Sequence, residues 1–528
     1  MSAVTSTKSV SLRIILTSAR AFDIGIAALG AIALALAFPK ANLAWLAPLG
    51  AAALFWLWYT SSWKRAFWLG WFAGFIFFVI SLSWVGHTVG SYLGALAPAV
   101  VVLPAILEGF FVGLAGIAAS LAFQNASRWV APFAAAAAFP IFEWIRSVGW
   151  IGSPFAQLGY SQADTPLALF AAYIGTYGVT FVVCIIGAYL ADAVVGKTPR
   201  RFVAALGAIA FAWAICWWAW PARQTSSGTF MRVAVIQGNI TQSLKWVPGS
   251  VPIAIARYVK MTQQAAAFHP ELIVWPETVI PEPLNEDPHA EQRFAKLAQH
   301  VHATLIVGAQ EIRDGGIYNA LYIFGPNGAL ENIYEKRQLV PFAESLPAKR
   351  YLNWIPYISE LAGTFASGTV DGVYSAGSLS FAPLICWESA FADLTHAQIR
   401  NGAQLLVIST DDAWFGETAG PPMHAQIAQL RAIENGTWVI RAAATGISGI
   451  IAPDGGYTAH SPLDKPATLY GFVSFPPGSI FANIGPTPII ISFAILYLAI
   501  LMLGTRRFRR LLSVAERRTD ERSHGWQE

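Results

Sequence analysis

A cysteine, a glutamate and a lysine in the second half of the chain have side chains suited to nucleophilic catalysis. Cys386 follows the apolar run Leu379 to Ile385 and precedes a stretch typical of the first turns of a helix. A thiol at such a strand-to-helix corner lies near the positive end of the helix dipole, which favours the reactive thiolate. A buried structural cysteine is the alternative explanation for this pattern.

The glutamate and the lysine supply the groups that such a thiol needs. Glu277 ends the stretch VWPE, where its carboxylate could accept the thiol proton. Lys336, in the stretch YEKR, could lower the thiol pKa and stabilise an oxyanion. Singly, a glutamate after a proline is usually a turn residue and a lysine is usually a solvated charge. The ordered set of three is far more specific than any one of them.

The elements that must position these residues fall into an apolar part and a soluble part. The 528 residues are 55% hydrophobic and 12% charged, whereas soluble domains carry about 25% charged residues. Residues 21–220 are almost uncharged, while 229–478 have the composition of a soluble domain. Part of the protein is therefore expected to lie in lipid.

Apolar stretches near the length of a bilayer predict eight membrane helices. Seven of them form a membrane region over 1–221, and one follows the soluble domain of 229–478 and precedes a basic tail over 505–528. The basic residues between these helices all fall on one side, so both termini are expected in the cytoplasm and the soluble domain outside it. The predicted helices are 22–38, 42–59, 66–85, 96–123, 129–146, 166–195, 202–220 and 488–504.

A few polar residues interrupt the apolar half. Glu143 and Arg146 lie three residues apart on one helix face, so a mutual ion pair is expected. Glu108 and His87 have no obvious partner, and each could line a cavity for lipid head groups or be a satisfied interior group. The first apolar stretch lacks a small-residue cleavage site and is expected to remain as an anchor.

Strand-like and helix-like runs alternate through the soluble part, which predicts a layered α/β domain with its site where strands end. Pro383 interrupts the run before Cys386, and a bulge is expected there. Cys386 is the only cysteine of this part and the histidines are scattered, so neither a disulfide nor a zinc site is expected. The runs with strand character are 231–239, 271–277, 304–309, 404–412 and 436–441, and the helical ones are 253–268, 290–302 and 422–435.

Longer stretches carry a family resemblance. WPET, YEKRQLVPFAESLP and LICWES resemble the nitrilase superfamily, whose fold is an αββα sandwich with a Glu-Lys-Cys triad. With the membrane helices, the chain resembles the bacterial apolipoprotein N-acyltransferases, and QGNITQSLKW, STDDAWFG and GPPMHAQIAQLRAIENG match that family. The resemblance covers almost the whole chain. It implies an α-helical transmembrane bundle of about eight helices joined to an α/β nitrilase-like αββα sandwich.

The resemblance also implies roles for single residues. Glu277 is the base, Lys336 stabilises the oxyanion and the thiolate, and Cys386 is the nucleophile. Glu344 matches the family's accessory acidic residue, with a salt bridge to Lys336 as the alternative. Ala343 stands where glycine is usual, and no metal or other cofactor is implied. The remaining matches near the site are Trp246 and Trp414, for which packing is the alternative, Glu388, and Trp387, which stands where tyrosine is frequent.

The activity that the resemblance implies is acyl transfer between two lipid-anchored partners. The thiolate would take an acyl chain from a phospholipid, and the α-amine of a diacylglyceryl apolipoprotein would resolve the thioester. Membrane lipids are further partners, nucleic acid is not, and the implied location is the bacterial inner membrane with the catalytic domain in the periplasm. Two alternatives stay open: a membrane-tethered amide or nitrile hydrolase, and a transporter or receptor whose outer domain only binds ligand.

Overall fold

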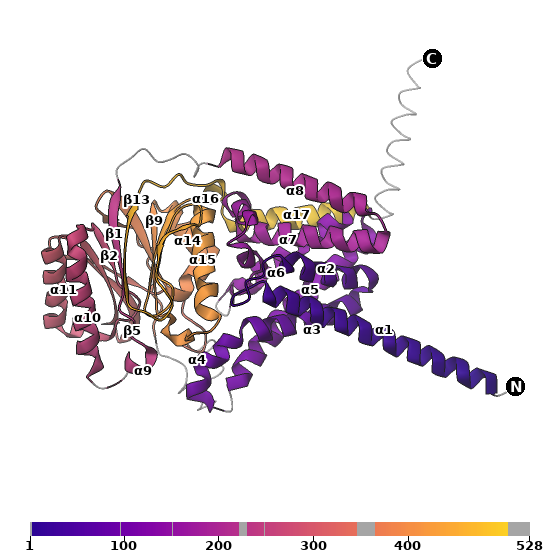
Figure 1. Cartoon of the computed structure of the whole chain (residues 1–528), viewed down its shortest axis with the longest axis horizontal. Coiled ribbons are helices and arrows are strands. Elements are labelled where there is room, and N and C mark those ends of the chain that lie inside the picture. The colour runs from indigo at the N-terminus through magenta and orange to yellow at the C-terminus, as the bar shows by residue number, and fades with distance from the viewer. Residues whose placement is uncertain are drawn as a thin grey trace, which may run out of the picture.

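The protein has a helical domain and an α/β domain that lie side by side along its long axis (Figure 1). The computed structural model describes residues 3–94, 97–149, 152–220, 230–245, 247, 249–345 and 365–504. The start of the first helix and the end of the last one point away from the α/β domain. The chain therefore leaves the helical domain after residue 220, builds the α/β domain and returns to the helical domain.

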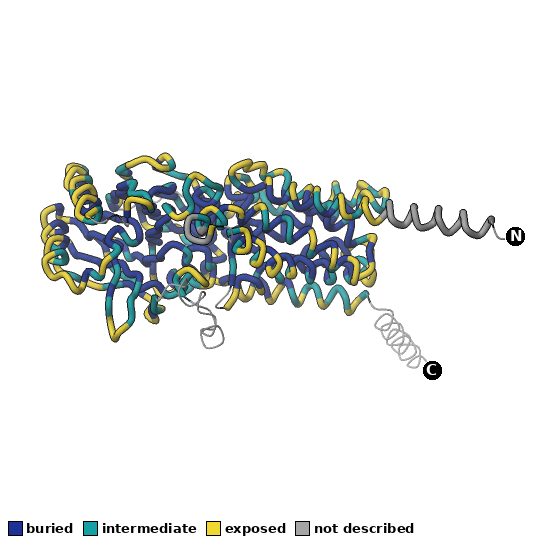
Figure 2. The backbone as a smooth tube through the Cα atoms, turned by 90° about the horizontal axis from the view of Figure 1, so that it is seen from below, coloured by how far each residue is buried: buried dark blue, intermediate teal, exposed yellow. Residues whose placement is uncertain are grey.

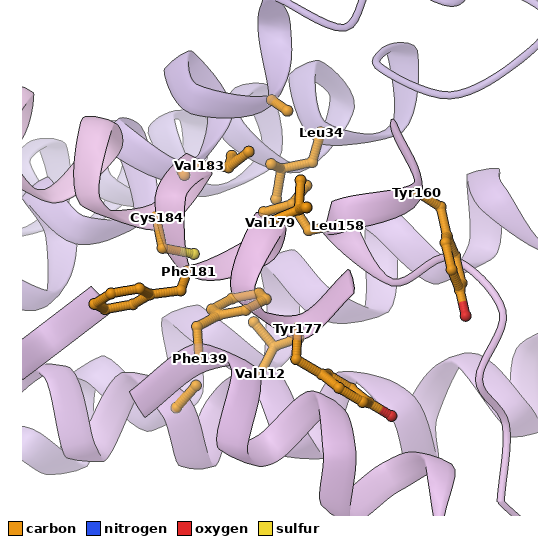
Figure 3. Close-up of a cluster of buried hydrophobic side chains, with 14 of the residues drawn as sticks. Leu34, Val112, Phe139, Leu158, Tyr160, Tyr177, Val179, Phe181, Val183 and Cys184 are labelled. Atoms are coloured by element: carbon orange, nitrogen blue, oxygen red, sulfur yellow. The ribbon is translucent and has the colours of Figure 1, made fainter. Parts of the chain in front are cut away.

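Long apolar helices form the helical domain, and residues from several of them meet in its core (Figure 3). Among the described residues, five helical segments are long and apolar enough to cross a membrane. This finding supports a membrane-spanning domain, while the predicted number of eight spans stays a prediction. The helices are α1 (Ala3–Leu36), α2 (Leu46–Thr60), α3 (Trp63–Ser81), α4 (Ser83–Leu93), α5 (Ala97–Asn125), α6 (Ala131–Ser147), α7 (Ala171–Gly196), α8 (Pro199–Ala219) and α17 (Pro486–Gly504).

The expected ion pair between Glu143 and Arg146 is wrong, because helix α5 and a loop that folds back into the helical domain supply other partners. Nη1 of Arg146 lies 3.1 Å from Oε2 of Glu108 and donates to the carbonyl of Phe155 at 3.1 Å. Glu143 instead accepts a hydrogen bond of 2.7 Å from the backbone N–H of Leu158. Glu108 thus has a partner that the sequence did not reveal.

The α/β domain contains two sheets packed face to face, each covered by helices on its outer side (Figure 1). One sheet has the order β13-β1-β2-β4-β5-β6, with β3 also paired to β4, and α10 (Ser250–Ala265) and α11 (Pro288–Val301) cover it. The other has the order β12-β11-β10-β9-β8-β7, with α14 (Ala392–Arg400) and α15 (Gly420–Asn435) outside. The predicted layered sandwich is confirmed.

The runs expected at 231–239, 271–277, 304–309, 404–412 and 436–441 each contain a strand, and the sheets also contain strands that were not predicted. Buried aliphatic side chains from both sheets fill the space between them, as two facing apolar surfaces require. The first sheet consists of β1 (Met231–Gln237), β2 (Leu272–Val274), β3 (Ile280–Pro283), β4 (Thr304–Arg313), β5 (Gly316–Phe324), β6 (Leu330–Glu335) and β13 (Ala467–Val473). The second consists of β7 (Tyr374–Ala376), β8 (Leu379–Ile385), β9 (Leu405–Thr410), β10 (Trp438–Ala443), β11 (Gly449–Ile451) and β12 (Tyr457–His460).

The bulge expected at Pro383 is wrong. Strand β8 pairs with β9 in an unbroken parallel register that places Pro383 opposite Val407. On its other side, β8 pairs with β7 only as far as Phe381. Among the described residues, β8 therefore has no paired strand beside Pro383 on that side, which is where a proline without an N–H is tolerated in a sheet.

Helix α15 joins the two domains, because it is buried on both sides. Met423, Ile427, Leu430 and Ile433 pack into the core of the helical domain. Its opposite side contributes alanines such as Ala428 to the core beneath the second sheet. Figure 2 shows buried chain continuing from one domain into the other. The shared helix α15 therefore contributes to fixing the orientation of the α/β domain on the helical domain.

Candidate active site

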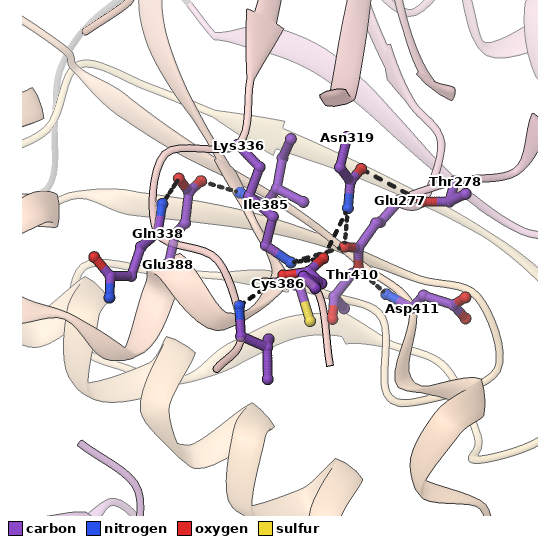
Figure 4. A network of polar contacts seen from close by, with 12 residues as sticks. Glu277, Thr278, Asn319, Lys336, Gln338, Ile385, Cys386, Glu388, Thr410 and Asp411 are labelled. Carbon is purple, nitrogen blue, oxygen red and sulfur yellow. Dashed lines mark hydrogen bonds and ion pairs between the residues drawn. The ribbon is translucent and has the colours of Figure 1, made fainter. Parts of the chain in front are cut away.

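The three residues selected from the sequence meet at one end of the sandwich (Figure 4). Glu277 follows β2 and Lys336 follows β6, both in the first sheet. Cys386 follows β8 in the second sheet. Because the two sheets face each other, these strand ends bring the three side chains together although Glu277 and Cys386 lie 109 positions apart in the sequence. Their shared location agrees with the prediction, and their catalytic roles remain a proposal.

Glu277 and Lys336 form the centre of a buried network of charges. Nζ of Lys336 lies 3.1 Å from Oε1 of Glu277 and 2.8 Å from Oε1 of Glu344. Oε1 of Glu277 also accepts a hydrogen bond of 2.7 Å from the side-chain amide of Asn319. Its other oxygen accepts one of 2.7 Å from the backbone N–H of Asp411. Each of these three partners is a donor, as an ionised carboxylate requires.

Both members of this pair are charged in the resting enzyme. Burial acts to raise the pKa of Glu277, but Lys336 and the hydrogen-bond donors outweigh it and lower the pKa below its usual value. Burial acts to lower the pKa of Lys336, but Glu277 and Glu344 outweigh it and raise that pKa well above its usual value. The expected salt bridge of Glu344 is thus present, and it keeps Lys336 a cation.

Cys386 begins a short 3₁₀ turn, Cys386–Ala390, with its backbone in the left-handed region at φ 52°. This conformation costs an L-residue about 1–2 kcal/mol, so contacts around the turn must hold it. Glu388 supplies several of them. One of its carboxylate oxygens accepts from the N–H of Ile385 at 2.7 Å, and the other accepts from the N–H of Arg337 at 2.7 Å. Glu388 thereby ties the cysteine turn to the segment that carries Lys336.

The resting thiol is neutral. Burial raises the pKa of Cys386 well above its usual value, Glu277 raises it further, and Lys336 and a hydrogen bond with Thr410 lower it. The expected contribution of a helix dipole is wrong, because α14 begins only at Ala392, beyond the 3₁₀ turn. Lys336 is therefore the charged group that favours the thiolate, and Glu277 is an ionised carboxylate available for the thiol proton.

Of the three tryptophans predicted near the site, one contacts the helical domain and one is partly exposed. Trp387 stacks on Phe155 of the helical domain, with ring centroids 5.1 Å apart and planes 12° apart. The residue after Cys386 therefore contacts the helical domain. Trp414 lies in the 3₁₀ turn Asp412–Phe415 after β9 and is 37% exposed, so it is not core packing. Trp246 lies outside the described residues.

The site also contains residues that the sequence analysis did not select. Asn319 lies within β5 and Asp411 at the end of β9, and each donates to Glu277. Lys245, 2.5 Å from a carboxylate oxygen of Asp411, fixes that residue in turn. The polar tip of the 404–412 run was a signal for Asp411, whereas nothing in the strand pattern marks Asn319. Among the described residues, no group of three or more His, Cys, Asp or Glu side chains could hold a metal ion.

Both domains match families of known proteins. The family described as apolipoprotein N-acyltransferase N-terminal domain matches residues 30–189, and the family described as carbon-nitrogen hydrolase matches residues 232–475. Among solved structures, the nitrilase superfamily member Nit3 from Saccharomyces cerevisiae matches with 19% sequence identity and a TM-score of 0.38, covering 50% of this chain and 93% of that one.

Relatives that match most of the chain come from several bacteria. The apolipoprotein N-acyltransferase of Shewanella oneidensis is 31% identical over 444 residues, which cover 79% of this chain and 83% of that protein. The protein of the same name from Coxiella burnetii is 30% identical over 83% of this chain and 91% of its own length. Similarity at this level extends through the membrane domain and the α/β domain together. The chain therefore belongs to the apolipoprotein N-acyltransferase family.

Proposed function

We propose that this protein moves an acyl chain from a phospholipid to the α-amine of a diacylglyceryl apolipoprotein through a thioester on Cys386. The observation that carries the proposal is the arrangement of a buried neutral thiol beside an ionised Glu277 and a protonated Lys336. A base, a cation and a nucleophile in one site are the groups that covalent acyl transfer needs. Family membership makes the chain an N-acyltransferase.

In the first half-reaction, Glu277 takes the thiol proton while sulfur attacks the sn-1 ester carbonyl of the phospholipid. Lys336 and the backbone N–H of Trp387, which directly follows the nucleophile, stabilise the oxyanion. The bond from carbon to the glycerol oxygen then breaks, and protonated Glu277 gives its proton to that oxygen. A lysophospholipid leaves, and the acyl chain remains on Cys386 as a thioester.

In the second half-reaction, the α-amine of the apolipoprotein attacks the thioester carbonyl, and Glu277 accepts the proton that the amine loses. The carbon–sulfur bond breaks, the sulfur takes that proton back, and the amide product leaves. The cycle restores the neutral thiol and the ionised carboxylate that the resting site contains. Acyl transfer of this kind is ping-pong and consumes neither nucleotide nor water.

The contact between Trp387 and the helical domain favours lipid-anchored substrates. The turn that carries the nucleophile packs against Phe155, so the site adjoins the membrane domain. Two substrates held in the bilayer would reach such a site by diffusion in the membrane plane. A hydrolase of soluble amides or nitriles, the alternative, has no need of this contact.

The test supplies the purified protein in detergent with a phospholipid whose sn-1 chain carries an isotope label and a synthetic diacylglyceryl lipopeptide. We expect the label on the N-terminal amine of the peptide, detected by mass spectrometry, and an equal amount of lysophospholipid. Labelled free fatty acid in place of acylated peptide would reject the transferase and support the hydrolase. Product formation from a lipopeptide with an acetylated amine would also contradict the proposal.

We further propose that the protein lies in the bacterial inner membrane with the α/β domain, between about 229 and 478, facing the periplasm. The side on which Lys and Arg residues fall supports this orientation. Helix α17 has 19 residues, about the length that crosses the hydrocarbon core. The segments 1–221, 488–504 and 505–528 would then be a seven-helix membrane region, a last membrane helix and a cytoplasmic tail.

Reporter fusions test this orientation. Alkaline phosphatase, which is active only outside the cytoplasm, is expected to be active when fused at Gly228 and inactive when fused after Arg510. A fluorescent protein that matures only in the cytoplasm should give the reverse result at both sites. Phosphatase activity at the C-terminal fusion would show that α17 does not span. Inactive phosphatase at Gly228 would place Cys386 on the cytoplasmic side and reject the orientation.

A further inference from the structure

A pocket of about 660 Å³ opens on the α/β domain, and the mechanism above does not use it. Its walls come from the first turns of α10 and α11, from β3 and from the segment that follows α9 (Gln242–Lys245). Figure 1 shows α10 and α11 at the end of the molecule away from the helical domain. Binding sites usually have volumes of about 300–1,000 Å³, so the pocket is large enough for a ligand.

Lys245 connects this pocket to the catalytic base. The side chain of Lys245 lines the pocket, and its Nζ lies 2.5 Å from a carboxylate oxygen of Asp411. The backbone N–H of Asp411 in turn donates to Glu277 at 2.7 Å. The floor of the pocket leads to the same place, because the buried ring of Phe294 packs edge-on against Trp275 with ring centroids 5.6 Å apart. The pocket therefore adjoins the catalytic site across Lys245 and Asp411.

The helical domain meets the catalytic site on a different side. Phe415, the last residue of the turn after β9, packs on Trp84 of α4 with ring centroids 4.6 Å apart. Figure 1 shows α4 and α9 at the same lower edge of the α/β domain, with α4 toward the helical domain and α9 toward α10. A substrate anchored in lipid would therefore enter from the side of α4, and its soluble part would leave on the side of the pocket.

The side chains around the pocket suit a polypeptide better than a lipid. Ile255 and Phe294 give it an apolar floor, and the exposed residues Glu282, Asp287 and Arg293 place both signs of charge at its edge. The carboxylates would repel the phosphate of a lipid head group, and an acyl chain would have to desolvate the charged groups. An extended peptide has apolar side chains for the floor and polar groups for the edge.

We propose that this pocket binds the polypeptide of the acceptor, a few residues after the N-terminal residue whose α-amine is acylated. With its lipid on the side of the helical domain and its amine at Cys386, the acceptor extends past Asp411 and Lys245 into the pocket. The apolar floor and the mixed charges at the edge accept side chains of different kinds. The inference rests on the proposed acyl transfer to an apolipoprotein, and it adds a binding site for the part of the acceptor that is not lipid.

The kinetic test compares two acceptors that share the same N-terminal residue. One is diacylglyceryl-cysteine amide, and the other is a lipopeptide of about ten residues, which spans roughly 30 Å when extended. For the parent protein we expect a KM about tenfold or more lower for the lipopeptide, with a similar kcat, because only the longer acceptor buries apolar side chains in the pocket. The measurement is the initial rate of N-acylation at varied acceptor concentration.

Two matched substitutions on neighbouring helices test the pocket itself. Ala290 on α11 lines the pocket, so Ala290→Trp should fill it and raise the KM for the lipopeptide toward that for the amide. Ala256 on α10 is exposed and lies outside the pocket lining. Ala256→Trp therefore serves as the control and should leave the KM for the lipopeptide unchanged.

A photoreactive acceptor tests the location without any substitution. A lipopeptide with p-benzoylphenylalanine at its fifth residue is illuminated with the purified full-length protein, and the crosslinked fragments are identified by mass spectrometry. We expect crosslinks to α10 and α11. Excess unlabelled lipopeptide should suppress these crosslinks, and phospholipid alone should not. If Ala290→Trp fails to fold, this experiment decides the proposal.

Three results would overturn this role of the pocket: equal KM values for the two acceptors in the parent protein, crosslinks confined to other segments, or suppression of the crosslinks by phospholipid alone. The last result would assign the pocket to the acyl donor. Failure of the proposed transferase would be recognised separately. In that case the parent protein would acylate neither acceptor, and the crosslinks would still decide whether a polypeptide occupies the pocket.

Discussion

Replacing Cys386 by alanine is expected to abolish both the covalent acyl adduct and the acylation of lipopeptide. Cys386 is the only cysteine within residues 229–478, and the neighbouring Glu277 and Lys336 form an ion pair with each other. Intact-mass analysis of protein incubated with phospholipid should show an added acyl mass in the parent and none in Cys386→Ala. A thioester is cleaved by neutral hydroxylamine, so that treatment should remove the adduct from the parent.

Cys216→Ala is the matched control, since Cys216 is another free thiol that lies on α8, outside the α/β domain. This variant should keep both the adduct and the transfer activity. An acyl adduct that persists in Cys386→Ala, or one that resists hydroxylamine, would show that the acyl chain is carried by another group. Full transfer activity in Cys386→Ala would favour a protein whose outer domain only binds its ligand.

Replacing Glu277 by glutamine is expected to slow both half-reactions by about 10²–10⁴-fold, since general base catalysis contributes about that much. The amide keeps the shape of the side chain and its place beside Asn319 but cannot accept a proton. Rapid mixing with p-nitrophenyl palmitate measures acylation, and transfer from pre-formed acyl-enzyme to the lipopeptide measures the second step. A variant that loses only one of the two steps would contradict a single base for both.

The same substitution should make the thiol more reactive toward a reagent that needs no base. The negative charge of Glu277 raises the pKa of Cys386 and the positive charge of Lys336 lowers it. Glu277→Gln therefore lowers the thiol pKa and speeds iodoacetamide alkylation at neutral pH, whereas Lys336→Met raises the pKa and slows it. The measurement is the alkylation rate between pH 6 and 10. Unchanged profiles in Lys336→Met would reject its role in stabilising the thiolate.

The sequence alone allowed prediction of those features that depend on local patterns, namely the apolar runs and the residues at the ends of strands. An apolar run that ends in a polar residue marked the positions of Glu277 and Cys386, and the alternation of strands and helices implied the sheets that bring them together. Strand β9 is buried along its whole length, and the parallel strands β8 and β10 on either side of it are buried except at Ser380 and Trp438. Their sequences are therefore mostly apolar and easily recognised.

The remaining parts depend on contacts between segments far apart in the chain. Arg146 pairs with Glu108, 38 residues away, and local helix spacing pointed to the wrong partner. His424 lies in a helix whose pattern predicts burial, but only the packing of α15 against the cysteine turn shows which groups it touches. Asn319 is a polar residue in the interior of a strand, where no rule about strand ends applies. Each of these positions is determined by tertiary structure.

Helix α15 has a consequence for any attempt to produce the α/β domain alone. Removing the membrane helices would expose four apolar side chains of α15, Met423, Ile427, Leu430 and Ile433. The burial of each such side chain stabilises the fold by about 1.5–3 kcal/mol, and this contribution would be lost. Glu434 would also lose the hydrogen bonds that it accepts from Thr176 in α7. The exposed apolar side of α15 would favour aggregation of the isolated domain. Truncation alone is therefore not expected to give a water-soluble version of this enzyme, because the apolar side of α15 would also have to be replaced by polar residues.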